Sequence, residues 1–116
     1  MACAAGLATQ QIYRREGLLT RARDIAGYWA DAVHSLKGLP HVIDLRNLGL
    51  IGAIELEPMP GKPGARAFDV FVRAFEKGIL VRVTGDIIAL SPPLIIERAH
   101  VDELFGKLAE VLRERG

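Results

Sequence analysis

Several features that would indicate a familiar class of protein are missing from this chain. Cys3 is its only cysteine, so no internal disulfide can form and a reducing compartment is expected. No apolar run is long enough to span a membrane, and the N-terminus lacks a basic region followed by a long apolar core. We therefore expect a cytoplasmic protein with no membrane partner.

The chain also lacks an excess of charge of either sign. Its formal net charge is +1, which argues against the basic surface that nucleic-acid binding requires. In contrast, 50% of its 116 residues are hydrophobic, a high share for one free-standing domain whose surface must be mostly polar. This excess indicates that some faces of the domain are covered by something else.

No group of residues forms a self-sufficient active site. The histidines His34, His41 and His100 lie in different predicted elements at no metal-ligand spacing, and Cys3 has no local partner. A glycine motif that could cradle a phosphate is absent as well. We therefore expect no catalytic, cofactor-binding or metal-binding residue in this chain.

The pattern of apolar and turn residues predicts an α+β domain with one small, largely antiparallel sheet covered by helices. The predicted order is helix, helix, two strands, helix, two strands and helix. These elements lie at residues 2–16, 19–36, 41–56 (two strands around a turn at 47–49), 65–77, 79–90 (a hairpin) and 98–114.

Periodicity within these elements predicts which side chains share a face. In the helix at 19–36, Trp29 anchors an apolar stripe that we assign to the core. In the first strand, Ile43 and Leu45 are expected on one face, and residues 49–52 indicate a close backbone approach. The helix at 65–77 carries its large apolar residues on one face: Phe68, Phe71, Val72 and Phe75.

The hairpin at 79–90 places one arginine, Arg82, among apolar neighbours. Thr84-Gly85-Asp86 is its turn, and the proline pair at 92–93 ends the pairing because proline donates no backbone hydrogen bond. A guanidinium suits a carboxylate or a phosphate. From the residues alone two interpretations stay open: a ligand-binding arginine, or an arginine whose head reaches solvent or pairs with Asp86.

Three segments resemble the class III aminotransferases, fold-type I enzymes that depend on pyridoxal phosphate. Residues 2–18 (ACAAGLATQQIYRREGL) resemble the helix after the family's glycine-histidine-proline turn, and residues 46–55 (RNLGLIGAIE) resemble its strand pair. Gly85-Asp86 followed by residues 91–94 (SPPL) and the Val101-Asp102 helix is the most specific signature. The closest resemblance is to the ω-amino acid:pyruvate, or amine:pyruvate, transaminases.

This resemblance implies a domain organisation. Residues 1–116 would be the C-terminal small domain, with residues 1–17 a truncated interdomain helix and the large domain that binds pyridoxal phosphate absent. The full enzyme would act on amine or amino-acid and 2-oxo acid substrates, and a homo-oligomer, the family dimer, is expected. One local departure is visible: Glu97 and His100 stand where the family has a capping threonine and an acidic residue, so a reciprocal capping box is not expected.

The resemblance also assigns a role to Arg82. In the ω-transaminase branch, an arginine just before the Thr-Gly-Asp turn pairs with the substrate carboxylate and swings aside for an uncharged substrate. Related class III enzymes often carry an arginine where this chain has Ala89. An arginine at position 82 and none at 89 implies the ω-amino acid or amine:pyruvate branch, with Arg82 as a substrate-binding residue.

The groups that hold and use pyridoxal phosphate lie upstream in the family pattern. Lys37, Lys62, Lys77 and Lys107 occupy surface-like helix ends or loops, so none is expected to form the Schiff base. This fragment alone is therefore expected to be inactive and to bind no cofactor. Two alternatives stay open: a free-standing binding or regulatory module built on the same domain, and a chain that needs a second polypeptide to complete the enzyme.

Overall fold

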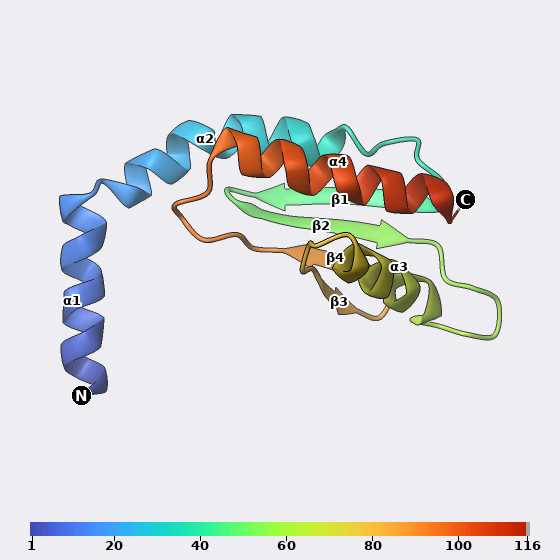
Figure 1. Cartoon of the computed structure of the whole chain (residues 1–116), viewed down its shortest axis with the longest axis horizontal. Helices are drawn as coiled ribbons and strands as arrows, with labels where there is room; N and C mark the ends of the chain where they lie inside the picture. The colour runs from blue at the N-terminus through green and yellow to red at the C-terminus, as the bar shows by residue number, and fades with distance from the viewer. Residues whose placement is uncertain (116) are drawn as a thin grey trace.

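The computed structural model describes residues 1–115, which form four helices and one four-stranded sheet (Figure 1). The predicted order of elements and the α+β class are confirmed. The helices are α1 (Ala2–Arg15), α2 (Leu18–His34), α3 (Ala65–Glu76) and α4 (Arg98–Glu114), and the strands are β1 (Val42–Leu48), β2 (Ile51–Leu56), β3 (Arg82–Thr84) and β4 (Ile87–Leu90).

The sheet is antiparallel throughout, with the strand order β1-β2-β4-β3. Gly49 and Gly85 make the two hairpin turns with φ of 56° and 58°, a left-handed conformation that glycine adopts without a steric cost. Because β3 pairs only with β4, it is an edge strand. After β4 the chain runs through the proline pair to α4, so the pairing of β3 with β4 does not continue beyond Leu90.

Helices cover one face of this sheet and leave the other open. The covered face buries Ile54 and Leu56 of β2 and Ile88 and Leu90 of β4 against α2, α3 and α4. Figure 1 shows α2 and α4 side by side over the sheet and α3 beside β3 and β4. The alternate residues of the same strands point to the open face, where they remain partly or fully exposed.

Trp29 lies at the centre of the core, as its spacing predicted. Its side chain is fully buried and meets Phe105 of α4 edge to face, with ring centroids 5.1 Å apart. The close backbone approach predicted for residues 49–52 is found at Gly52. A Cβ there would lie 3.0 Å from Val33 Cγ2 and 3.4 Å from the Trp29 ring.

Two expectations about local structure were wrong. Ile43 does not share a face with Leu45: it is 57% exposed, because the register with β2 shifts between Val42 and Asp44 and the resulting bulge interrupts the alternation. The large apolar residues of α3 share one face, as expected, but the helix packs on the core through another face. That helix buries small residues instead, Ala67, Val70 and Ala74, and leaves Phe68 and Phe75 58% and 64% exposed.

The second correction concerns the start of α4. The Glu97 backbone N–H donates to His100 Nδ1 at 3.1 Å, and the Glu97 carboxylate faces the backbone N–H of His100, so the two residues form a capping box. A histidine ring nitrogen thus replaces the carboxylate or amide oxygen that usually accepts this bond.

α1 stands apart from this body. It extends away from the sheet (Figure 1), contacts α2, and buries none of its residues. Gly17, with φ of 60°, makes the bend between α1 and α2. Among the described residues, no helix is both long and apolar enough to cross a membrane.

Candidate substrate-binding site

The β3–β4 hairpin holds Arg82 through the alternation of its side chains. Val81 is buried and Val83 packs against the core, so Arg82 and Thr84 point to the other side and are exposed. Register pairs Arg82 with Ala89 of β4. The guanidinium is therefore carried by a strand whose own core residues fix its orientation.

Asp86 fixes the turn of this hairpin and is not a partner of Arg82. Its Oδ2 accepts a hydrogen bond from the Gly64 N–H at 2.8 Å, and its carbonyl oxygen accepts one from the Leu56 N–H at 2.8 Å. Asp86 Oδ1 is buried without a hydrogen-bond partner among the described residues. Asp86 thus joins the turn to the loop before α3 and does not pair with Arg82. The other form of the second interpretation, a head that reaches solvent, agrees with the exposure of Arg82.

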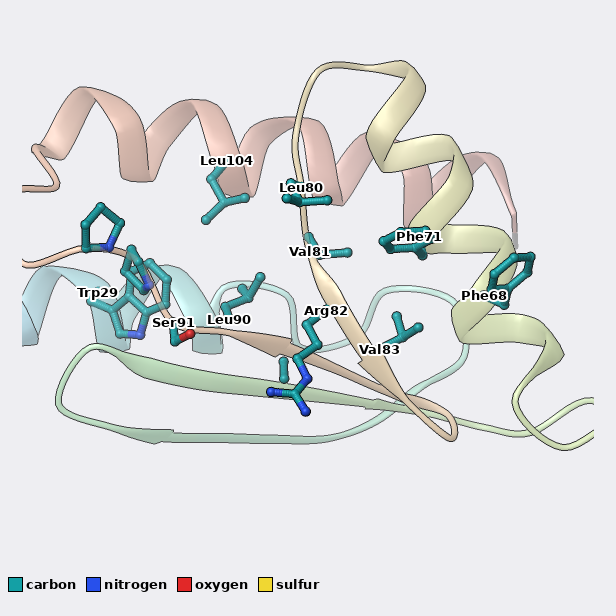
Figure 2. A pocket seen from close by; sticks show the side chains of 13 residues that line it. Trp29, Phe68, Phe71, Leu80, Val81, Arg82, Val83, Leu90, Ser91 and Leu104 are labelled. Carbon is teal, nitrogen blue, oxygen red and sulfur yellow. The ribbon is translucent and has the colours of Figure 1, made fainter. Parts of the chain in front are cut away.

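A hollow of about 700 Å³ opens at the end of the hairpin (Figure 2). Its wall combines three elements of structure: the β3–β4 hairpin, the proline segment, and aromatic or aliphatic side chains from the helices. The lining residues are Trp29, Phe68, Phe71, Leu80, Val81, Arg82, Val83, Ala89, Leu90, Ser91, Pro92, Pro93 and Leu104. Arg82 is the only charged residue among them.

The helical part of this wall was not predicted as a site. The sequence places Trp29 in the core alone and gives the aromatic face of α3 no role in a site. The sequence does carry one signal: α3 has a large apolar face. A four-stranded sheet that α2 and α4 already cover needs little further apolar cover, so part of that face is available to line a site. Phe68 and Phe71, whose rings stack with centroids 6.0 Å apart, line the hollow instead.

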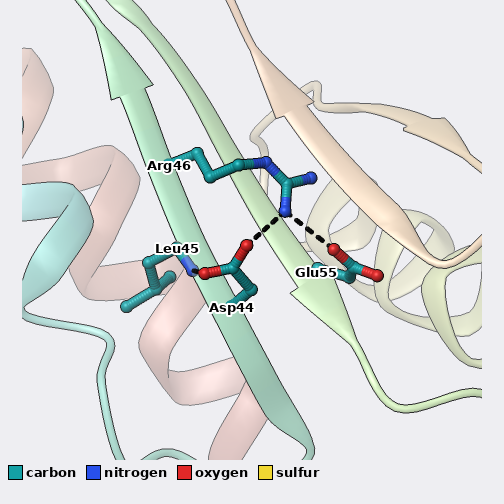
Figure 3. Close-up of polar contacts among 4 residues, drawn as sticks. All are labelled: Asp44, Leu45, Arg46 and Glu55. Atoms are coloured by element: carbon teal, nitrogen blue, oxygen red, sulfur yellow. Dashed lines mark hydrogen bonds and ion pairs between the residues drawn. The ribbon is translucent and has the colours of Figure 1, made fainter.

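Arg82 has no ion pair or side-chain hydrogen bond within residues 1–115. The other arginine of the sheet differs in this respect. Arg46 donates from Nη1 to both Asp44 and Glu55, the latter at 2.7 Å (Figure 3). The Glu55 and Asp44 carboxylates raise the pKa of Arg46, and the Arg46 guanidinium holds the pKa of Asp44 below its ordinary value. The free guanidinium is the one beside the hollow.

The remaining titratable residues that the sequence singled out lie elsewhere. His34 Nε2 lies 3.0 Å from Asn47 Oδ1, and His41 Nδ1 lies 3.5 Å from Glu57 Oε2. Lys77 pairs with two glutamates of α4, and Lys107 with Glu103 of its own helix at 2.8 Å. In the described part of the chain, no three metal-ligand side chains gather at one point.

These positions decide whether the chain's own residues fit pyridoxal phosphate. A Schiff base needs a lysine beside the bound substrate, but no lysine lines the hollow that holds Arg82. The hollow also offers no second cation for a phosphate. The residues described here therefore do not fit the cofactor, and no step of its chemistry is assigned to them.

Fold and hollow together define a small α+β domain with one apolar, arginine-bearing candidate site. The family model for class-III aminotransferases matches residues 1–112, and the chain belongs to this family. It is 57% identical over 112 residues to an omega-aminotransferase of Caulobacter vibrioides, and this match covers 97% of the chain and 26% of that protein. An omega-amino acid–pyruvate aminotransferase of Pseudomonas putida is 35% identical, with 98% of the chain and 25% of that protein covered.

Solved structures agree with this assignment. A transaminase solved with L-Ala superposes with a TM-score of 0.92 at 29% identity, covering 98% of this chain and 28% of that one. An adenosylmethionine-8-amino-7-oxononanoate aminotransferase from Methanocaldococcus jannaschii gives a TM-score of 0.87 at 31% identity, covering 97% and 27%. The chain thus spans about a quarter of the length of the relatives it matches.

Proposed function

We propose that this chain serves as the small domain of a pyridoxal phosphate-dependent ω-amino acid (amine):pyruvate transaminase, in which Arg82 binds the substrate carboxylate. The observation that carries this proposal is the state of Arg82. It is the only charged residue on an apolar hollow of about 700 Å³, and it has no partner within residues 1–115. A cation in such a place is free for a ligand of opposite charge.

The names of the relatives support a carboxylate as that ligand. Both an omega-amino acid–pyruvate aminotransferase and a beta-alanine–pyruvate aminotransferase from Pseudomonas aeruginosa match the chain at 35% and 36% identity. ω-Amino acids, β-alanine and pyruvate all carry a carboxylate. The planar guanidinium can donate two parallel N–H bonds to its two oxygens, a charge-assisted arrangement stronger than neutral hydrogen bonds.

In this mechanism the chain supplies binding and orientation. Once a substrate fills the hollow, apolar lining residues such as Phe71 and Leu104 would keep water from it and so strengthen the ion pair. With the carboxylate held at one point, the amino or carbonyl end of the substrate is oriented toward the rest of the site. The lysine that bears pyridoxal phosphate, and the groups that bind the cofactor, would lie outside this chain.

The proposal includes a homo-oligomer and a cytoplasmic location. α1 leaves Leu7 67% exposed and buries no residue, so it offers an apolar surface to a neighbour. The exposed Cys3 is a free thiol, which suits a reducing compartment. The free-standing binding module remains the second candidate, because Arg82 is already accessible in the chain by itself.

A chimera tests whether the chain acts as this domain. In the Caulobacter vibrioides omega-aminotransferase, the 112 matched residues are replaced by those of this chain. We expect the chimera to bind pyridoxal phosphate and to transaminate β-alanine with pyruvate. A folded, cofactor-loaded chimera without turnover would contradict the proposal. Binding of an organic acid by the isolated chain, measured by calorimetry, would favour the module instead.

A further inference from the structure

The segment between β4 and α4 forms one wall of the hollow that holds Arg82. Residues 91–93, which include both prolines, line this hollow. Proline has no backbone N–H to donate. Within residues 91–96 of the described chain, one backbone hydrogen bond is made, from the Ile96 N–H to the Pro93 carbonyl oxygen at 3.1 Å. The wall therefore lacks the ladder of hydrogen bonds that holds a strand or a helix in place.

The same segment borders a second hollow, of about 450 Å³. Ser91 and Pro92 line both hollows, whereas the rest of the second lining comes from α2, the β1–β2 turn and Leu94. The two hollows share no other lining residue, so residues 91–92 are their common boundary. A boundary with open space on both faces has little side-chain packing to keep it in place.

Arg21 of α2 reaches this segment although it lines neither hollow. Its Nη1 donates a hydrogen bond to the Leu94 carbonyl oxygen at 2.6 Å, across 73 positions of sequence. The Arg21 side chain is half-buried and makes no ion pair within residues 1–115. A bond from a charged donor is stronger than one between neutral groups. Arg21 thus ties the segment to α2.

The helix that carries Arg21 is a firm base for this bond. Ile25 and Trp29 follow one and two turns further along α2, and both are buried in the core. Trp29 also lines the hollow that holds Arg82. The bond from Arg21 therefore fixes the proline wall of that hollow relative to the helix that supplies Trp29.

We propose that Arg21 is a positioning residue that sets the width of the hollow, an inference that rests on the proposed function of this hollow. Arg21 touches no substrate. It acts through the carbonyl group of Leu94, which keeps residues 91–93 in place. Without this bond the segment moves toward the second hollow, and the hollow that holds Arg82 widens. The wider hollow fits a small substrate less closely and admits a larger one.

Hydrogen exchange of the chain itself tests whether Arg21 holds the segment. We expect Arg21→Ala to speed exchange of the Ile96 amide roughly tenfold, as for loss of one hydrogen bond from a charged donor, measured by NMR. The amide of Ile54 in the central strand β2 should not change, because the effect is local. Arg21→Lys keeps a donor and should restore most of the protection. Unchanged exchange at Ile96 in Arg21→Ala would overturn the proposal.

Half-reactions of the chimera test whether the width matters, with 1-phenylethylamine and the bulkier 1-(1-naphthyl)ethylamine. Arg21→Ala should lower kcat/KM for the smaller amine roughly tenfold and affect the larger amine less, so that their ratio shifts at least about threefold. Arg21→Lys should return the ratio to its original value. The matched control is Arg23→Ala, since Arg23 is an exposed arginine of the same helix. Equal losses for both amines would overturn the positioning role.

The outcome for the proposed function is read from a different variant. If Arg82→Ala leaves β-alanine turnover unchanged, the carboxylate role of Arg82 fails. If Arg82→Ala impairs β-alanine and Arg21→Ala leaves the ratio of the two amines unchanged, only the role of Arg21 fails. Should Arg21→Ala not fold, judged by circular dichroism, Arg21→Met is measured against the same criteria, because it keeps an apolar stem without a donor.

Discussion

Gly52 of β2 lies against Val33 and Trp29 of α2, and the absence of a side chain permits this contact. An added Cβ would lie 3.0 Å from Val33 Cγ2, and Val33 is itself fully buried, so it has little freedom to move away. The sequence predicted this close approach from the glycines alone. The identity of the opposing side chains, Val33 and Trp29, required the three-dimensional structure.

Gly52→Ala should therefore destabilise the fold. We expect a loss of about 1–3 kcal/mol, typical of overpacking in a well-packed core, measured as a lower Tm by circular dichroism. The matched control is Gly106→Ala on α4, where nothing lies within 4 Å of the added atom. That change should raise stability by roughly 0.5–1 kcal/mol, because alanine favours a helix over glycine. A neutral Gly52→Ala would contradict the packing described here.

The role of Asp86 belongs to the residue scale as well. Spacing could not distinguish a partner of Arg82 from a turn residue, because both functions suit an aspartate just after Gly85. Its bond to Gly64 joins residues 22 positions apart in sequence. Such a long-range hydrogen bond depends on how the loop before α3 folds back, and no local pattern encodes that.

At the scale of elements, the order of helices and strands was predictable and their faces were only partly so. The apolar stripe of α2 located the core because Trp29, buried among helices and sheet, follows the helical period. In β1 a bulge changed the period, and a bulge leaves no clear mark in the sequence. On α3 two apolar faces compete. The smaller side chains face the core because they allow the helix to approach the sheet.

An ion pair joins Asp69 of α3 to Arg115, the residue that follows α4. Arg115 Nη2 donates to Asp69 Oδ1 at 2.8 Å, and its Nε donates to Oδ2, a bidentate arrangement. The hydrogen bond from Arg115 holds the pKa of Asp69 below its ordinary value. The pair thus contributes stability while the carboxyl is ionised.

The lowered pKa of Asp69 gives a prediction about pH. Its stabilising effect should be fully present above the unfolded-state pKa, about 3.9, and should be lost as the pH falls through the lower pKa of the folded state. Asp69→Asn should therefore flatten the acid limb of a plot of Tm against pH, so that the Tm of the variant changes less with pH than that of the original chain in acidic samples. Identical acid limbs for both proteins would contradict the assignment. Because the pair is partly exposed, salt should weaken the effect.

For the whole molecule, α1 predicts association. Its small apolar side chains at positions 2, 4, 5 and 7 are exposed, and the helix packs against α2. Exposed contiguous apolar surface drives self-association. We expect sedimentation velocity, under reducing conditions that keep Cys3 a thiol, to show oligomers at high micromolar concentration. Leu7→Glu should lower the association, whereas the control Gln10→Glu should not. A monomer throughout would refute the prediction.

The whole chain by itself should also be unable to start the reaction. No lysine lies at the hollow, so we expect no transaminase turnover and no single Schiff-base adduct when pyridoxal phosphate is added. An absorbance scan, borohydride reduction and peptide mapping measure this. Scattered adducts on surface lysines are compatible with the prediction. One stoichiometric adduct at a defined lysine is not.

Arg82 could be singled out from the sequence because one cation stood in an apolar hairpin, and its proposed role is the central claim. The most direct measurement is the pair of half-reactions of the chimera and its Arg82→Ala variant, with β-alanine and with 1-phenylethylamine. Arg113→Ala, an exposed charge on α4 away from the hollow, is the matched control.

We predict that Arg82→Ala lowers kcat/KM for β-alanine by roughly 30- to 5,000-fold, since a bound carboxylate left without its partner costs about 2–5 kcal/mol. The value for 1-phenylethylamine should be retained, and Arg113→Ala should change neither substrate. Equal losses for the two substrates in Arg82→Ala, or no loss for β-alanine, would contradict the claim that Arg82 binds the substrate carboxylate.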